Sequence, residues 1–188
     1  MLIPLAEVKE NKQLIIDSIK KGFIFIYPTD TIYGIGCDAT NESAVLKLRM
    51  LKERYDKPLL VVAPSKKWIY ENCIVQKKFE KYIEKLPGAF TFILKLKNKN
   101  CINKYVNIDS DDLGIRIPKH MITKVIQESK KPFITTSVNI SGKEFAKKIQ
   151  DIPEKIKKEC IIIDAGFLDG KPSSLIDLTG NMPKILNR

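Results

Sequence analysis

Apolar side chains recur at helical spacing in several stretches of the chain. In residues 5–21 the apolar positions fall on one helix face and the pattern ends at Gly22, which predicts a helix. Residues 41–54 show the same spacing behind Thr40 or Asn41, either of which is suited to cap a helix. Three further helices are predicted at residues 76–85, 119–130 and 152–158.

Short apolar runs form a second pattern, which predicts buried strands. These runs are residues 23–27, 58–63, 89–96, 114–117, 132–137, 160–164, 174–178 and 184–186. Residues 29–40, rich in Thr, Gly and Asp, are expected to form a loop or an irregular strand. Helices and strands alternate at first and strands dominate later. We therefore expect one α/β domain over residues 1–188, with a mixed sheet and flanking helices.

The composition is that of a globular protein. With 44% hydrophobic and 29% charged residues over 188 positions, the chain is long enough to bury a sizeable core. No apolar run approaches the roughly 18 residues that span a bilayer. The N-terminus lacks the basic region and long apolar stretch of a signal peptide. We expect a cytoplasmic protein with no membrane association.

The charge balance points to an anionic partner. Lys and Arg number 33 against 22 acidic residues, which gives a formal net charge of +11. A planar guanidinium makes bidentate contacts that an ammonium group does not make. In a background so rich in Lys, the arginines are therefore the stronger candidates for ligand contacts. They are Arg49, Arg54, Arg116 and Arg188.

Several common chemistries lack the residues that they need. The four cysteines are widely spaced and His120 is the single histidine, so we predict reduced thiols and no metal site. His120 is expected to cap a helix or to lie at the surface. The chain has no G-x-x-x-x-G-K-[ST] phosphate loop. The GIGCDA run at 34–39 does not open a helix directly, as a dinucleotide fingerprint would.

Polar segments at the ends of predicted elements are the candidates for chemistry. PTDTIYGIG at 28–36 follows a buried strand and brings together Thr29, Asp30, Thr31 and Tyr33. These side chains are suited to bind a small polar ligand, although an ordinary turn has the same composition.

Three cations close the second predicted helix. Lys52, Arg54 and Lys57 fall within six residues. They would form a phosphate clamp, with Arg54 as the bidentate member, or a solvated helix end in which cations offset the helix dipole.

Two further features lie later in the chain. SVNISG at 137–142 follows a strand, where Ser137 and Asn139 would bind a ligand beside an anion-binding nest or form a polar turn. Arg116 lies inside an apolar strand and must face solvent or an anion. Arg188 ends the chain, where side chains are ordinarily disordered.

Six motifs follow one another in a characteristic order: PTDTIYG, KER with KPLLVVA, LPGAFTFIL, GIRIPKH, SVNISG and PSSLIDL. Together they resemble the YrdC-like family of threonylcarbamoyl-AMP synthases over nearly the whole chain. The resemblance implies a twisted open sheet, similar to a double-stranded-RNA-binding fold, with a concave, positively charged face. It also implies synthesis of threonylcarbamoyl-adenylate from L-threonine, bicarbonate and ATP, with release of pyrophosphate, for the threonylcarbamoyladenosine modification of tRNA.

The resemblance also assigns residues to roles. The family's K-x-R and S-x-N signatures fall on Lys52, Arg54, Ser137 and Asn139, which would be the catalytic set. The residues implied near ATP are Lys52, Arg54, Lys57, Asn139, Lys147 and Arg188. Those implied near threonine are Thr31, Arg116, Ser137 and Ser173, with the Arg116 fork on the carboxylate. Mg²⁺ would enter with ATP, and tRNA and a threonylcarbamoyl transferase complex are the further partners that the resemblance suggests.

The segment after the K-x-R signature departs from the family pattern. Tyr55, Asp56 and Lys57 stand where the family usually has a proline and one residue more. Lys147 stands where a threonine is usual. Arg49, on the same predicted helix as Lys52, is expected to be structural or solvated.

Two other functions agree with parts of the sequence. A net charge of +11 would also serve a non-catalytic double-stranded-RNA-binding module of the same fold, through contacts to the RNA backbone. A carbamoyl-transfer domain of hydrogenase maturation proteins would bring a longer chain and zinc-finger cysteines. An RNA-binding module needs neither the K-x-R nor the S-x-N signature, so these signatures favour the synthase.

Overall fold

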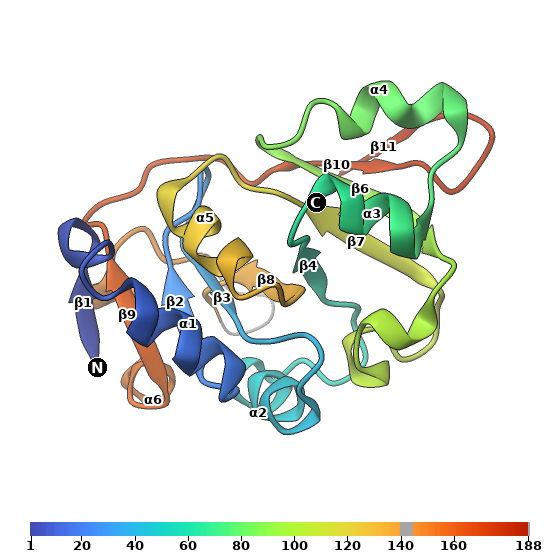
Figure 1. The fold of residues 1–188 in the computed structure, drawn as a ribbon. Helices are drawn as coiled ribbons and strands as arrows, with labels where there is room; N and C mark the ends of the chain where they lie inside the picture. Colours follow the sequence, from blue (N-terminus) through green and yellow to red (C-terminus); the bar gives the residue numbers. More distant parts are fainter. Residues whose placement is uncertain (140–144, 188) are drawn as a thin grey trace.

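The computed structural model describes residues 1–139 and 145–187, which form an eleven-stranded sheet (Figure 1). In sheet order the strands are β1 (Leu2–Pro4), β9 (Cys160–Asp164), β2 (Ile24–Tyr27), β3 (Gly34–Gly36), β8 (Phe133–Ser137), β4 (Leu60–Val62), β7 (Asp112–Arg116), β6 (Phe90–Leu96), β10 (Ser174–Asp177) and β11 (Lys184–Leu186). β5 (Cys73–Ile74) pairs with β6 outside this order. Parallel pairs such as β2–β9 and β4–β7 stand beside antiparallel pairs such as β3–β8 and β4–β8. The predicted mixed α/β sheet with flanking helices is therefore confirmed.

Helices cover both faces of this sheet (Figure 1). They are α1 (Lys12–Lys20), α2 (Glu42–Lys52), α3 (Lys66–Asn72), α4 (Glu80–Ile83), α5 (Met121–Glu128) and α6 (Glu154–Lys157). Ile24 and Ile26 belong to one apolar cluster, whereas Phe25 and Tyr27 belong to a second. Because neighbouring residues of a strand point to opposite faces, the two clusters lie on opposite faces of the sheet. The second cluster includes residues of α1 and α5, and the first includes residues of α2.

Several predicted boundaries are wrong at the N-terminus and in the middle of the chain. The helix expected at 5–21 begins only at Lys12, because Leu5–Glu7 form a 3-10 turn after β1. β1 was not predicted, since its partner β9 is remote in sequence and three residues carry no periodicity. The sequence also missed α3 and β5. Residues 76–85 hold a short 3-10 helix followed by α4 rather than one helix.

Residues 29–40, expected to form a loop or an irregular strand, contain the short strand β3. It pairs with both β2 and β8 in antiparallel register. A Cβ atom at Gly36 would lie 1.7 Å from the carbonyl oxygen of Ile134 in β8. Glycine is required here because the two backbones approach closely.

Helix α2 ends in a sharp turn that directs the following loop. Asn41 caps its start, since the Asn41 Oδ1 accepts the Ala44 N–H at 3.0 Å. Glu53 follows the helix in the left-handed conformation, with φ of 51°. The Arg54 N–H donates to the Arg49 carbonyl at 3.0 Å. Lys52 is therefore the last residue of α2, whereas Arg54 lies beyond the left-handed turn at Glu53.

The structure also bears on the predictions for His120, for the cysteines and for membrane association. The His120 Nδ1 accepts the Ile122 N–H at 3.3 Å at the start of α5, so the predicted capping role is confirmed. The four cysteines are free, and burial raises the pKa of Cys73 and of Cys160 to about 12. Among the described residues, none of the helices has both the length and the apolar character to cross a bilayer.

Candidate active site

Two cavities adjoin at the middle of the sheet. The larger has a volume of about 480 Å³ and the smaller about 30 Å³. Both are lined by Leu60 of β4 and by Thr136 and Ser137 of β8. A ligand in one cavity would therefore lie next to a ligand in the other, with the end of β8 between them.

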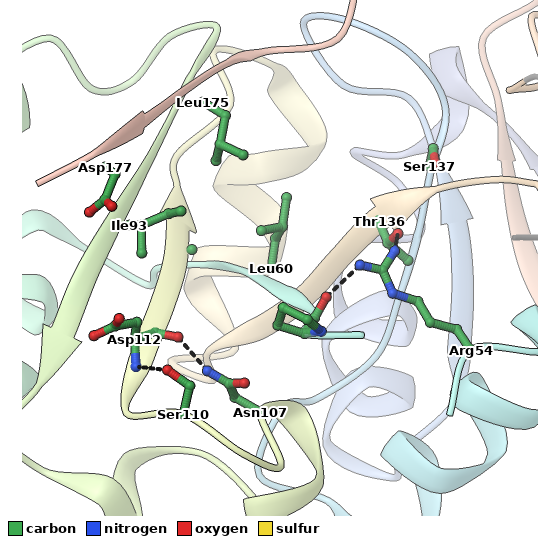
Figure 2. A pocket seen from close by; sticks show the side chains of 12 residues that line it. Arg54, Leu60, Ile93, Asn107, Ser110, Asp112, Thr136, Ser137, Leu175 and Asp177 are labelled. Carbon is green, nitrogen blue, oxygen red and sulfur yellow. Dashed lines mark hydrogen bonds between the residues drawn. The ribbon is translucent and has the colours of Figure 1, made fainter. Parts of the chain in front are cut away.

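The larger cavity has charged groups on opposite sides. Arg54 lies on one side, and Asp112 and Asp177 lie on the other (Figure 2). The apolar side chains between these groups are Leu60, Ile93 and Leu175. Asn107 and Ser110 complete the wall near Asp112. Such a cavity suits an elongated ligand with an anionic end and an apolar, hydrogen-bonding body.

Lys52 joins the K-x-R segment to the S-x-N segment. Its side chain is 1% exposed. Its Nζ donates to the Ser137 carbonyl oxygen, to the Asn139 carbonyl oxygen at 2.8 Å and to the Asn139 Oδ1 at 3.1 Å. The Ser137 hydroxyl also donates to the Asn139 Oδ1, at 2.7 Å. The structure thus brings together the residues of both signatures, which lie far apart in the sequence.

The electrostatic environment of Lys52 weakens its charge. Burial, and secondarily the nearby Arg54 guanidinium, lower the pKa of Lys52 to about 7. A charged ammonium has the three protons that its three acceptors require, whereas a neutral amine has two. Lys52 therefore loses a hydrogen bond to the 137–139 segment when it is deprotonated.

Arg54 is the cation that faces the larger cavity. Its Nη2 donates to the Pro58 carbonyl at 2.5 Å, and its Nη1 lies 3.4 Å from the Thr136 hydroxyl (Figure 2). Burial lowers the pKa of Arg54 from its ordinary value, and the neighbouring Arg49 adds to this effect. The guanidinium is thus held at the boundary between the two cavities.

The smaller cavity is lined by hydroxyl groups and one guanidinium. Arg116 is 5% exposed, and its Nη2 donates to the Asp30 Oδ1 at 2.6 Å. Both Nη atoms of Arg116 lie 3.5 Å from the Thr31 hydroxyl. The other Asp30 oxygen accepts the Lys119 N–H at 2.9 Å. Asp30 therefore fixes the orientation of the guanidinium that the cavity presents.

Further hydroxyls complete this lining. The Ser173 hydroxyl lies 2.7 Å from the Thr91 hydroxyl, and both residues are buried. The Thr29 hydroxyl lies 2.8 Å from that of Thr31 and donates to the Ile32 carbonyl. The backbone turn expected at PTDT thus places Thr31 inward, beside Arg116.

Not every predicted site residue reaches the cavities. The structure places Thr31, Arg116, Ser137 and Ser173 around the smaller cavity and Arg54 and Ser137 around the larger. Four residues predicted near ATP are not among the described residues that line either cavity: the exposed Lys57 and Lys147, and also Lys52 and Asn139. The Lys147 Nζ instead pairs with Asp169 at 2.5 Å. Arg188 lies outside the described residues.

Gly170 is a residue near the site that sequence analysis did not single out. A Cβ atom at Gly170 would lie 1.8 Å from the Thr31 carbonyl oxygen. The segment before Ser173 therefore packs its backbone directly on the PTDT turn. Only the spatial neighbours of Gly170 show that a side chain there would displace Thr31.

Gly170→Ala is expected to raise the KM for the ligand of the smaller cavity by about tenfold to a hundredfold, because Thr31 must shift to admit the methyl group. Gly180→Ala is the matched control, since its Cβ would meet only the Met182 carbonyl oxygen, at 4.0 Å. Steady-state kinetics with each substrate varied in turn measures the effect. Equal KM values in the two variants would show that Thr31 does not need this position.

Comparison with known proteins identifies the family. The family model Sua5_yciO_yrdC, described as telomere recombination, matches residues 17–188. A Methanocaldococcus jannaschii protein, provisionally named threonylcarbamoyl-AMP synthase, is 36% identical over 183 residues, which cover 90% of this chain and 83% of the relative. The threonylcarbamoyl-AMP synthase of Vibrio campbellii is 27% identical over 176 residues, covering 89% of this chain and 94% of the relative.

Solved structures agree with this result. P. abyssi Sua5 complexed with L-threonine has a TM-score of 0.87 and 26% identity, and the match covers 100% of this chain. A variant of P. abyssi Sua5 has a TM-score of 0.90 and 28% identity. This chain spans 57% and 59% of the lengths of these two structures. On the family match and the identity to the M. jannaschii relative, the chain belongs to the Sua5/YciO/YrdC family.

Proposed function

We propose that the chain is an L-threonylcarbamoyladenylate synthase, a nucleotidyltransferase that uses L-threonine, bicarbonate or CO₂, and ATP. The observation that carries this proposal is the pair of adjoining cavities. One is small, rich in hydroxyls and backed by Arg116, and the other is long and faced by Arg54. A reaction that joins an amino-acid derivative to a nucleotide needs two such sites with a common boundary.

L-threonine would bind at the smaller cavity with its carboxylate at Arg116 and the rest of the molecule in the adjoining larger cavity, because about 30 Å³ is close to the volume of one water molecule. The Arg116 guanidinium offers planar donors to a carboxylate. The hydroxyls of Thr31 and Ser173 offer partners for the hydroxyl and amine of the substrate. The family relative P. abyssi Sua5 is known in complex with L-threonine, which supports this assignment.

The larger cavity would hold ATP. The Arg54 Nη1 lies 3.4 Å from the hydroxyl of Thr136, which lines both cavities, so the α-phosphate would lie there. The nucleoside would extend along the apolar side chains toward Asn107 and Asp112, whose polar atoms suit a base or a ribose (Figure 2). This orientation directs the phosphates to the cation and the uncharged end away from it.

The reaction would proceed in two steps. The threonine amine adds to CO₂, loses a proton and becomes a carbamate. A carbamate oxygen then attacks the α-phosphorus of ATP, and the bond from that phosphorus to the pyrophosphate oxygen breaks. Arg54 would offset the charge that develops on the phosphates, while Lys52 would hold Ser137 and Asn139 at the boundary. Positioning and electrostatics supply the rate, without a covalent enzyme intermediate.

Mg²⁺ would enter as the counter-ion of ATP, with phosphate oxygens and water as its ligands. Among the described residues, no group of three or more His, Cys, Asp or Glu side chains is arranged to hold a metal ion. The charge of Mg²⁺ would neutralise part of the polyphosphate.

The product would pass to a threonylcarbamoyl transferase that modifies tRNA, and we propose the cytoplasm as the compartment where these partners meet. The alternative of a non-catalytic RNA-binding module would leave both cavities without a role. The net charge of +11 would still favour a contact with tRNA.

The test is release of pyrophosphate from ATP by the purified protein with Mg²⁺ and bicarbonate. Release should require both L-threonine and bicarbonate. Arg54→Ala should reduce it about a hundredfold or more, while Lys95→Ala, a change at an exposed lysine of β6, should leave it unchanged. Release that does not depend on threonine would exclude the synthase function.

A further inference from the structure

Arg49 is buried rather than solvated. It lies on α2, one turn before Lys52, and is 3% exposed. Its Nε donates to the Tyr105 carbonyl at 2.6 Å, and its Nη2 donates to the Val106 carbonyl at 3.3 Å. The structural alternative predicted for Arg49 is the one that the fold adopts.

The third nitrogen of the same guanidinium serves another segment. The Arg49 Nη1 donates to the carbonyls of Arg54, Tyr55 and Lys57 at 2.9, 3.0 and 3.2 Å. One side chain therefore binds five backbone carbonyl oxygens in two separate segments, residues 54–57 and 105–106.

These two segments carry opposite sides of the larger cavity. The first supplies Arg54 and leads into Pro58, and the second leads directly into Asn107. A backbone hydrogen bond of 3.1 Å from Leu59 to Val106 continues the connection. The Asn107 amide in turn binds the Asp112 carbonyl (Figure 2). The position of Arg49 thus sets the separation between the cationic side and the Asn107 side.

Side-chain packing gives the loop little support. The side chains of Tyr55, Asp56 and Lys57 are exposed. The residue directly after Arg54 is Tyr55 rather than a proline. The path of the loop into the cavity is therefore determined by hydrogen bonds to its backbone carbonyls, three of them from Arg49 and two from Arg54, to Lys57 and Pro58.

Burying a cation to hold two backbone segments is energetically unfavourable, so the hydrogen bonds that Arg49 makes must offset the cost. Burial lowers the pKa of Arg49 from its ordinary value, while Asp56 opposes the shift. Lysine would place one point charge with three donors, which does not span carbonyls that lie in two directions. The planar fork is suited to bridging the two segments.

We propose that Arg49 is a positioning residue for the ATP half of the site. It acts through residues 54–57 and 105–107 and does not touch the nucleotide. This inference rests on the proposed function. It names a determinant of ATP binding that leaves the threonine cavity unaffected, because Arg49 lies outside that lining.

The test compares Arg49→Lys with Val45→Ala, which removes buried methyl groups from the same helix and destabilises it without removing a hydrogen bond to either segment. We expect Arg49→Lys to raise the KM for ATP about tenfold or more and to change the KM for L-threonine by less than about twofold. In Val45→Ala both KM values should stay near those of the wild type, despite a lower melting temperature.

Calorimetric titration of each protein with Mg-ATP separates the possible failures. Wild-type protein that binds no ATP would exclude the proposed function. Wild-type binding with equal ATP affinity in Arg49→Lys would overturn the positioning role alone. A parallel loss of affinity for ATP and threonine, or an Arg49→Lys chain that does not fold even with saturating ATP, would make Arg49 a residue of the fold and would also overturn it.

Discussion

Replacing Arg116 by Lys is expected to raise the KM for L-threonine about a hundredfold, or about 3 kcal/mol, and to leave the KM for ATP within about twofold. The Arg116 guanidinium is buried and already oriented by Asp30 at 2.6 Å. Lysine would keep the charge and its ion pair with Asp30 but would lose the planar pair of donors that a carboxylate prefers. Initial-rate kinetics with threonine and ATP varied separately measures both constants.

Lys119→Ala is the matched control for this experiment. Lys119 also lies beside Asp30, but its contact uses the backbone N–H and its side chain is exposed. The control therefore removes a nearby positive charge without removing the fork, and its KM for threonine should stay within about twofold of the wild type. An Arg116→Lys enzyme with a normal KM for threonine would place the amino-acid carboxylate elsewhere.

The second large effect is a dependence of ATP affinity on pH through Lys52. Burial lowers the pKa of Lys52 to about 7 in the free protein, and an adjacent polyphosphate would raise it again. ATP binding should therefore take up a proton above neutral pH, and Kd should rise by up to about tenfold per pH unit there. Deprotonation also removes one of the hydrogen bonds that hold Ser137 and Asn139. Calorimetric titration with Mg-ATP between pH 7 and pH 9 measures the slope and, in buffers of different ionisation enthalpy, the proton uptake.

Lys52→Met provides the comparison, because it removes the titrating group while ATP keeps its own ionisations. The variant should bind ATP weakly and show a flatter dependence on pH. A slope equal to that of the wild type would assign the proton to another group.

The same pKa shift fixes the sign of a stability effect. Because the pKa of Lys52 is lower in the folded state than in the unfolded chain, the unfolded state binds more protons between the two values. Its contribution to the free energy of unfolding should therefore increase as pH rises from about 7 toward 10.5.

Much of the architecture was predictable because long apolar runs carry their own periodicity. Strands β2, β6, β8 and β9 and helices α2 and α5 fall within the predicted stretches. β1 did not, because its pairing with β9 joins distant parts of the chain and leaves no local pattern.

The sequence indicated which residues belong to the site, but not how these residues contact one another. Motif order singled out Lys52, Ser137 and Asn139, which the fold brings into contact. The sequence did not reveal that Lys52 is buried. The packing of Gly170 on Thr31 and the five carbonyls around Arg49 depend on backbone positions that residue types do not encode.

In the proposed reaction, a carbamate formed on threonine becomes joined to AMP where the two cavities meet. Mass spectrometry of the products formed from ¹³C-labelled bicarbonate, L-threonine and Mg-ATP would detect this bond. We expect an adenylate that contains both threonine and the labelled carbon, formed together with pyrophosphate and much reduced in Arg54→Ala. An unlabelled threonyl-adenylate, or hydrolysis of ATP with no adenylate containing threonine, would contradict it.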